Sequence, residues 1–185
     1  MRILLSTLLS ILFLASCEND IAEVNKLFTK QETQVEVAKG VELLYSDSAR
    51  LTMRIECPVL VRHLDKVNPW QEFPEGILVE FFDEDGSKKG SLSADFATRE
   101  ENANKFVVRK NVVWISKNGE QLETEELIWD EVENRVYTNK FVVVKRTDEI
   151  IYGHGFESNN DFTRWKIRAI EGRVRADDYT RDFKN

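Results

Sequence analysis

The sequence predicts an all-β fold made mainly of antiparallel strands. From Gly40 onward, apolar and polar residues alternate with a period of two, not with the 3.6-residue period of a helix. Polar turns such as 46–48 separate the alternating runs, as hairpins require. A weak repeat of about thirty residues then recurs, which is typical of stacked structural units. The product is one long folded sheet.

The first sixteen residues form a predicted signal peptide. Arg2 precedes an apolar run from Ile3 to Leu14, and residues 14–17 (Leu-Ala-Ser-Cys) form a lipobox. The alternative is a short transmembrane anchor, but the run is shorter than the about 20 apolar residues that span hydrocarbon. We therefore expect Cys17 to be acylated and to hold the mature chain at a membrane.

The remaining chain divides into a tether, one domain and a tail. Residues 17–39 are mostly polar and are expected to be a lipidated tether, with a short helix over 21–28 as the alternative. Residues 40–176 are long enough for a single β domain with one core. Residues 177–185 form a polar C-terminal tail.

The β domain opens with a predicted hairpin of residues 41–45 and 51–55. Residues 59–63 continue as a strand, and a loop with two prolines follows over 68–76. The repeat then begins at Ile77, and each of its three copies contains three strands. Three strands are too few to bury an apolar face, so the copies must stack on one another. The predicted strands are 77–82, 92–98 and 106–108, then 112–116, 122–129 and 136–138, then 141–144, 151–156 and 165–168.

One set of apolar residues is predicted to point to the inside of this sheet. Two sheets packed face to face would bury these side chains against one another. A sheet that stays open would instead present a trough for acyl chains, which gain about 0.8 kcal/mol per buried CH₂. Periodicity leaves both alternatives open. The predicted interior residues are Leu92, Ala94, Phe96, Phe106, Val108, Trp114, Leu122, Val136, Val143, Tyr152 and Ile167.

The sequence offers no residues for catalysis, so we expect a protein that is not an enzyme and needs no cofactor. Two histidines, His63 and His154, are too few and too scattered for a metal cluster. Residues 83–86 resemble half a calcium loop but lack the later glutamate, and a hairpin turn explains them as well. The acidic residues over 123–133 alternate into water. Nucleophile elbows, phosphate-binding glycine loops and dinucleotide fingerprints are missing from the sequence.

Charge argues against nucleic acid as a partner. The net charge is −7, and no basic block occurs. Basic residues near the C-terminus alternate with Trp165, Ile167 and Ala169, a pattern typical of a strand with one solvated face. The alternative is that these basic side chains bind phosphate groups. These cations are Arg164, Lys166, Arg168, Arg173 and Arg175. With Cys17 acylated, Cys57 has no partner and is expected to be a small buried side chain.

Several segments, taken in order and spacing, resemble the LptC family of lipopolysaccharide export proteins, in its Bacteroidetes-type lipoprotein form. The resemblance covers about residues 41–172. The segments that carry it are 41–47 (VELLYSD), 73–77 (FPEGI), 79–83 (VEFFD), 92–95 (LSAD), 111–113 (NVV), 119–127 (GEQLETEEL), 137–138 (YT) and 153–156 (GHGF).

The resemblance implies an open, twisted antiparallel β-jellyroll of the OstA/LptA-like kind, whose apolar interior shields lipopolysaccharide acyl chains. It also implies two protein partners: the inner-membrane ABC transporter that extracts the lipid, and a periplasmic LptA-like bridge protein. The expected location is the periplasm, lipid-anchored at the inner membrane. Better-studied relatives carry a transmembrane helix where this chain has a lipobox, so here the lipid supplies anchoring only.

Two other classes of function remain open. One is a periplasmic lipid or lipoprotein carrier, or a scaffold lipoprotein of outer-membrane assembly; a carrier would need a closed half-barrel with lid helices, for which no helical segment is evident. The other is a surface lipoprotein that binds or cleaves glycans. It would need exposed aromatic platforms, such as Trp70, Trp129 and Trp165, and a close carboxylate pair.

Overall fold

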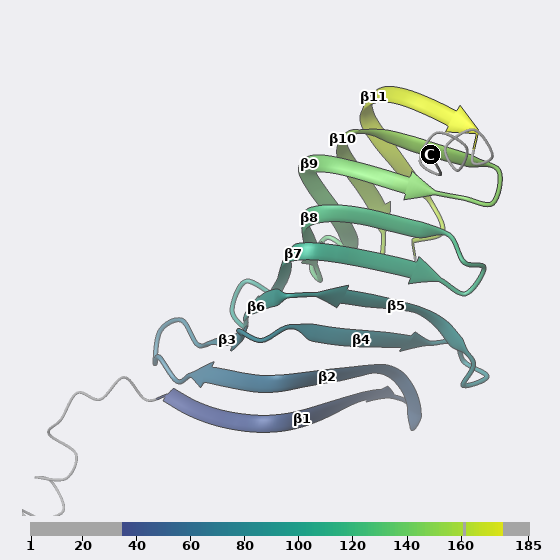
Figure 1. The fold of residues 1–185 in the computed structure, drawn as a ribbon. Helices are drawn as coiled ribbons and strands as arrows, with labels where there is room; N and C mark the ends of the chain where they lie inside the picture. The colour runs from purple at the N-terminus through teal and green to yellow at the C-terminus, as the bar shows by residue number, and fades with distance from the viewer. Residues whose placement is uncertain (1–34, 161, 176–185) are drawn as a thin grey trace, which may run out of the picture. The chain divides into compact units, whose positions relative to one another are not determined.

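The computed structural model describes residues 35–160 and 162–175. Within these ranges the chain forms one antiparallel sheet of eleven strands and no helix, which confirms the predicted all-β class (Figure 1). The strands are β1 (Val35–Asp47), β2 (Arg50–His63), β3 (Trp70–Phe73), β4 (Ile77–Phe82), β5 (Lys88–Ala94), β6 (Phe96–Glu100), β7 (Lys105–Ser116), β8 (Gln121–Asp130), β9 (Arg135–Lys145), β10 (Glu149–Asn159) and β11 (Trp165–Arg175).

The sheet folds back on itself because its long strands bend near their middle. β7 shows how: residues 105–109 pair with β6, residues 113–116 pair with β5, and the bend between them contains Lys110 and Asn111 at positive φ. β10 bends at Gly155, whose φ of 75° suits glycine. The result is two layers of an open, twisted jellyroll, with β4 and β5 in one layer and β3 and β6 in the other.

The bends explain the repeat in the sequence. In each copy, two strand segments pair in the layer of β4 and β5, and the next two pair in the layer of β3 and β6. The second copy, for example, pairs 112–115 with 121–124 in one layer and 128–130 with 135–137 in the other. One repeat is therefore one hairpin in each layer, and neither hairpin has a buried face until its neighbours stack on it.

Both ends of the sheet are open within the described residues. β1 pairs only with β2, and β11 pairs only with β10. The sheet therefore does not close into a barrel, and each terminal strand leaves one row of backbone N–H and C=O groups without strand partners.

The structure corrects two predicted boundaries. The tether was expected to reach residue 39, but β1 begins at Val35, and residues 35–39 pair with 59–63 of β2. The predicted loop over 68–76 contains β3, because its four residues between the prolines pair with both β2 and β6. The signal peptide, the lipid-attachment residue Cys17 and the tail over 177–185 lie outside the described residues.

Candidate functional site

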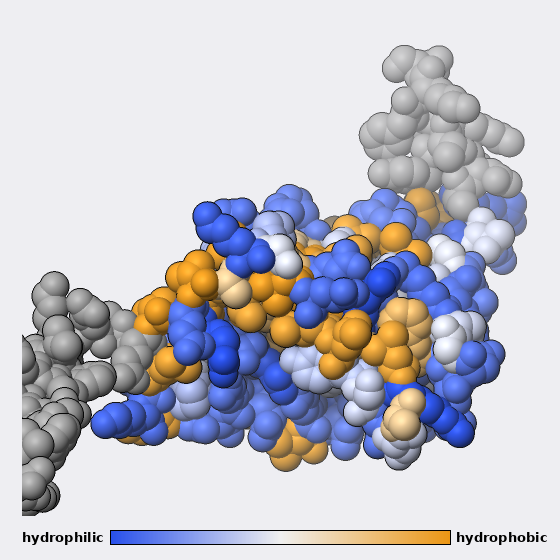
Figure 2. All heavy atoms as spheres, turned by 90° about the horizontal axis from the view of Figure 1, so that it is seen from below, coloured by the Kyte–Doolittle hydropathy of each residue, from blue (hydrophilic) through white to orange (hydrophobic). Residues whose placement is uncertain are grey.

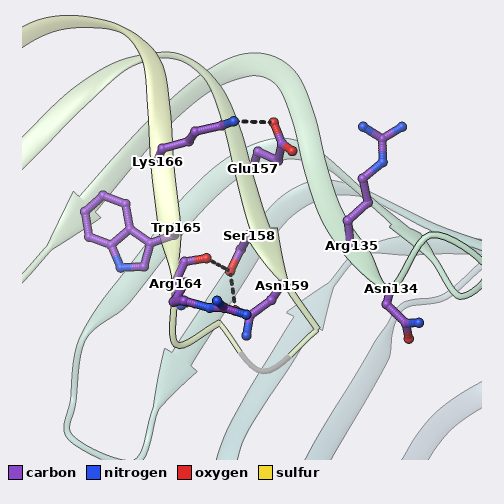
Figure 3. A pocket seen from close by; sticks show the side chains of 8 residues that line it. All are labelled: Asn134, Arg135, Glu157, Ser158, Asn159, Arg164, Trp165 and Lys166. Carbon is purple, nitrogen blue, oxygen red and sulfur yellow. Dashed lines mark hydrogen bonds and ion pairs between the residues drawn. The ribbon is translucent and has the colours of Figure 1, made fainter.

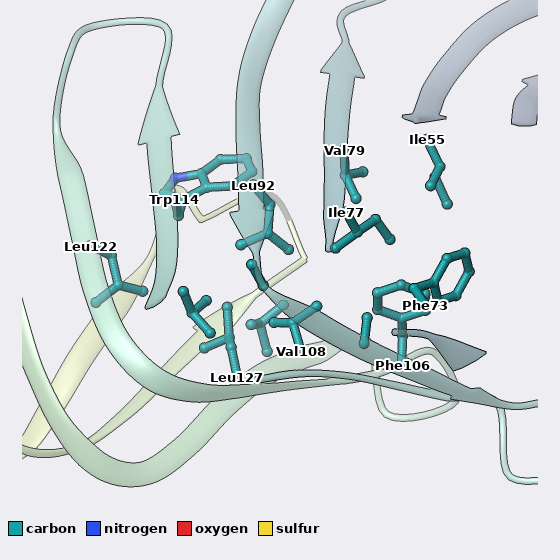
Figure 4. Packing of buried hydrophobic residues seen from close by; sticks show 14 of the residues in the cluster. Ile55, Phe73, Ile77, Val79, Leu92, Phe106, Val108, Trp114, Leu122 and Leu127 are labelled. Carbon is teal, nitrogen blue, oxygen red and sulfur yellow. The ribbon is translucent and has the colours of Figure 1, made fainter. Parts of the chain in front are cut away.

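The candidate site is the apolar interior between the two layers. Ile55, Val79 and Leu92 of one layer face Phe73 and Phe106 of the other (Figure 4). All belong to a single buried cluster, which hydrophobic burial stabilises. Its members are Ile55, Cys57, Leu60, Phe73, Ile77, Val79, Leu92, Ala94, Ala97, Phe106, Val108, Val112, Trp114, Leu122, Leu127, Val136, Val142, Val144 and Phe156.

Most of the predicted interior residues lie in this interior. Ile167 is half-buried and packs against the cluster, while the other correctly placed residues are buried members of it. Their inward orientation is confirmed; their contact with lipid stays a prediction. The buried ones are Leu92, Ala94, Phe106, Val108, Trp114, Leu122 and Val136.

The inward orientation of Phe96 is wrong. Ala94 is buried and Asp95 is exposed, but the next buried residue is Ala97, so the alternation shifts by one residue at the bend between β5 and β6. Phe96 pairs with Arg109 on the outer face, where the Lys110 ammonium lies 6.0 Å from its ring centroid.

Val143 and Tyr152 are also outward, and they face each other across β9 and β10. In β9 the buried positions are Val142 and Val144, so Val143 points to the opposite side. In β10 the buried neighbour Ile151 pairs with Val144. A run of adjacent apolar residues carries no alternation, so the pattern cannot indicate which of them points inward.

The prediction also missed interior residues before Leu92 and at the bends. The alternation of Ile77 with Val79, both buried, was a usable signal for the first group. No comparable signal marked Phe73, which lies between two prolines.

The interior is filled by the protein's own side chains. Its cavities measure about 20, 30 and 20 Å³, each comparable to the space of a single water molecule. The first is lined by side chains that include Met53, Phe81 and Trp129, and the Trp129 indole N–H is buried without a hydrogen-bond partner in the described part of the chain. An acyl chain would therefore have to separate the layers or displace side chains to enter.

Aromatic rings join the two layers away from the bends. Phe81 of β4 lies 6.2 Å from Trp129 of β8 in the other layer, and 5.2 Å from Trp114 in its own layer, measured between ring centroids. Phe162 stacks on Trp114 at 4.0 Å. On this side of the molecule the two layers meet through side chains and not through backbone hydrogen bonds. The layers can therefore separate here at a lower cost in free energy than at the bends, where continuous strands join them.

A polar contact closes the same side near β1. Arg99 of β6 donates hydrogen bonds to the Tyr45 hydroxyl at 3.2 Å and to the Glu131 carboxylate at 3.4 Å. Its guanidinium also lies 5.8 Å from the centroid of the Tyr45 ring. Arg99 thus connects β1 of one layer to β6 and the end of β8 in the other.

Apolar side chains continue to both open ends of the interior. At the β1 end, Val41, Leu43 and Tyr45 are half-buried against the cluster, and at the β11 end Trp165 and Ile167 are. Viewed from the β1 end, hydrophobic residues form a band across the molecule (Figure 2). Apolar side chains therefore line the interior continuously from one open edge to the other.

The described residues contain no cluster of three or more metal-ligating side chains. His63 lies 3.4 Å from Glu72, and the two stay isolated from His154, which contacts Glu171 at 2.5 Å. Cys57 is buried as expected, and burial raises the pKa of its thiol. No helix among the described residues is long and apolar enough to span a bilayer.

Fold and site together define an open two-layer β-jellyroll with an apolar interior and two edge strands, each of which pairs on one side only within the described residues. Compared with known proteins, the chain matches no protein-family model and no curated protein.

Proposed function

We propose that this chain is a lipid-anchored periplasmic component of lipopolysaccharide export. It accepts lipopolysaccharide from an inner-membrane ABC transporter and passes it along a β-jellyroll bridge toward the outer membrane. The observation that carries the proposal is the apolar interior, which continues between two open sheet edges. The lipobox at Cys17 and the resemblance of residues 41–172 to the LptC family add the location and the ligand class.

The physical requirement of the task matches this arrangement. Acyl chains crossing an aqueous compartment need continuous apolar cover, while sugars and phosphates can stay hydrated. Unpaired edge strands such as β1 and β11 can dock further sheets by strand addition. The energy for transport must come from the transporter, because no nucleotide-binding motif occurs in the sequence.

Photo-crosslinking in cells tests this function. A photoreactive phenylalanine analogue replaces Trp114, which is buried in the interior, or the adjacent Ile115, which is exposed on the outer face. A lipopolysaccharide adduct at position 114 and none at 115 is the expected result. Adducts at both positions, or at 115 alone, would contradict an interior path.

The tight packing of the interior is the observation that favours the alternative, a scaffold lipoprotein of outer-membrane assembly. A scaffold uses the sheet only as a surface, so its interior stays closed. A functional chain without any lipopolysaccharide adduct at position 114 would support the scaffold.

A further inference from the structure

A hollow of 490 Å³ lies where strands β9, β10 and β11 begin or end (Figure 3). Its volume falls within the range of about 300–1,000 Å³ typical of small-molecule sites. Polar and charged side chains dominate its lining, in contrast to the apolar interior. The lining residues are Asn134, Arg135, Glu157, Ser158, Asn159, Arg164, Trp165 and Lys166.

The hollow is cationic, although the whole chain is acidic. Arg135, Arg164 and Lys166 outnumber one carboxylate, Glu157, while the chain carries a net charge of −7. Within the described ranges Arg164 forms no ion pair. Lys166 pairs with Glu157 at 3.1 Å, but the Lys166 side chain is 65% exposed and that of Glu157 is 36% exposed, so an anionic ligand can exchange with this solvent-accessible contact.

Other contacts hold the lining in place. The Arg135 guanidinium stacks 4.4 Å from the centroid of the Tyr137 ring and also pairs with Glu133. The Ser158 hydroxyl donates to the Arg164 carbonyl, and the Asn159 side chain accepts from the Arg164 backbone N–H. The loop that carries Arg164 is thereby fixed to β10, which limits the entropy lost when a ligand binds.

The position of the hollow relative to the interior suggests what it binds. Lys166 lies on the outer face of β11 and Arg164 directly precedes the strand, while Trp165 between them packs toward the core, 6.0 Å from the Phe156 ring. β11 is an edge strand, so its cationic face and the apolar end of the interior are separated by a single strand. A molecule with an anionic head and apolar chains can contact both at this edge.

We propose that this hollow binds a phosphate group carried on the sugar headgroup of an amphiphile whose acyl chains enter the interior at the β11 end. Arginine and lysine are the side chains that bind phosphate through charge-assisted hydrogen bonds. The proposal rests on the proposed function for the identity of the lipid, whereas the phosphate site follows from the hollow alone.

The experiment measures binding by the full-length chain in nonionic detergent micelles. The probes are diphosphorylated lipid A, fully dephosphorylated lipid A, glucosamine 6-phosphate and inorganic phosphate. The site variant is Arg164→Gln with Lys166→Gln. The matched control is Arg173→Gln with Arg175→Gln, which removes the same amount of charge from β11 outside the hollow.

We expect the site variant to bind diphosphorylated lipid A about tenfold more weakly than the unmodified chain, because charge-assisted contacts at a hydrated surface are each worth a few-fold in affinity. The control variant should differ by less than twofold. Dephosphorylated lipid A should bind all three proteins alike, and the soluble phosphates should bind much more weakly than the lipid.

Each other result overturns part of the proposal in a recognisable way. Equal losses in site and control variants would mean diffuse electrostatic attraction in place of a site. Equal binding of both lipid A forms would remove the phosphate site and leave the lipid-export function intact. Site-dependent binding of glucosamine 6-phosphate without binding of either lipid would keep the phosphate site and reject the export function. Soluble phosphates bound as tightly as lipid A would reject a lipid source for the phosphate.

Discussion

At the scale of single residues, Glu80 on the outer face is held by two cations. Its carboxylate accepts hydrogen bonds from Lys88 Nζ at 2.8 Å and from Arg54 Nε at 2.9 Å. These bonds, that of Lys88 first, lower the pKa of Glu80 below its ordinary value of 4.5. The charged form therefore stabilises the fold above that value, and this contribution is lost as the pH falls through the lower, folded-state pKa.

We predict that Glu80→Gln lowers the free energy of unfolding by about 1.5–3 kcal/mol at pH 7, the range of a hydrogen bond to a charged group. As the pH falls through the lowered pKa of Glu80, the native carboxylate becomes protonated as well, so the difference between the variant and the original chain should shrink and then vanish. Urea unfolding at pH 7 and at a series of lower pH values measures this. Glu84→Gln serves as control, since Glu84 forms an exposed ion pair with Arg50 and its loss should change little across the series.

Cys57 offers a second residue-scale test. Its thiol is buried and its pKa is raised by burial, so little thiolate is present and little of the side chain is exposed to reagents. In a Cys17→Ser variant Cys57 is the single thiol of the chain. We predict that it reacts with a thiol reagent at pH 8 only at the rate of unfolding, and at once in denaturant. Fast reaction in the native state would mean that β2 opens locally near the bend.

At the scale of elements, the attachment of β11 depends on Gly153. A Cβ at this position would lie 2.1 Å from the backbone carbonyl oxygen of Ala169 in β11, a clash that no side-chain rotation relieves. We predict that Gly153→Ala loosens β11 and raises hydrogen exchange over 165–175, with little change in β4 and β5. Gly172→Ala is the control: there the Cβ meets the end of the Tyr152 side chain, which can rotate away. Equal exchange in both variants would show that β11 is not held at this crossing.

The strands also show which features of the fold can be predicted from the sequence. The strands and most turns follow from alternation, as in the hairpin that pairs Leu43 with Ile55. Alternation fixes a face only within a straight strand, however, and each bend can shift it by one residue. Phe96 was misplaced because the shift occurs at Asp95, a polar residue with no distinctive signal for it.

Contacts between the two layers could not be predicted from the sequence, for a different reason. The stack of Phe162 on Trp114 and the Tyr45–Arg99–Glu131 contact join residues far apart in the chain, through side chains on opposite layers. They depend on how the folded sheet closes, and periodicity carries no information about that closure. The inner and outer faces were thus mostly predictable, whereas the degree of opening was not.

At the scale of the whole molecule, the two open edges differ in what they offer a partner. β1 presents apolar side chains, with Val37 and Leu44 each 60% exposed, and follows directly on the expected tether. β11 presents the cations of its outer face beside Trp165 and Ile167. If the chain bridges a membrane transporter and a periplasmic partner, the tether favours β1 as the membrane-side edge and leaves β11 for the next sheet.

We therefore predict that removal of residues 165–185, which deletes β11, releases the downstream bridge protein while the rest of the sheet stays folded. The reason is that β10 would become the edge with a different register and without the cationic face. Co-purification of the partner measures the loss, and thermal unfolding of the truncated chain establishes that it is folded. The point variant Gly153→Ala provides a milder form of the same change and should weaken the association without deleting any residue. A folded, truncated chain that still retains the partner would place the downstream contact at β1 and reverse the direction of the path.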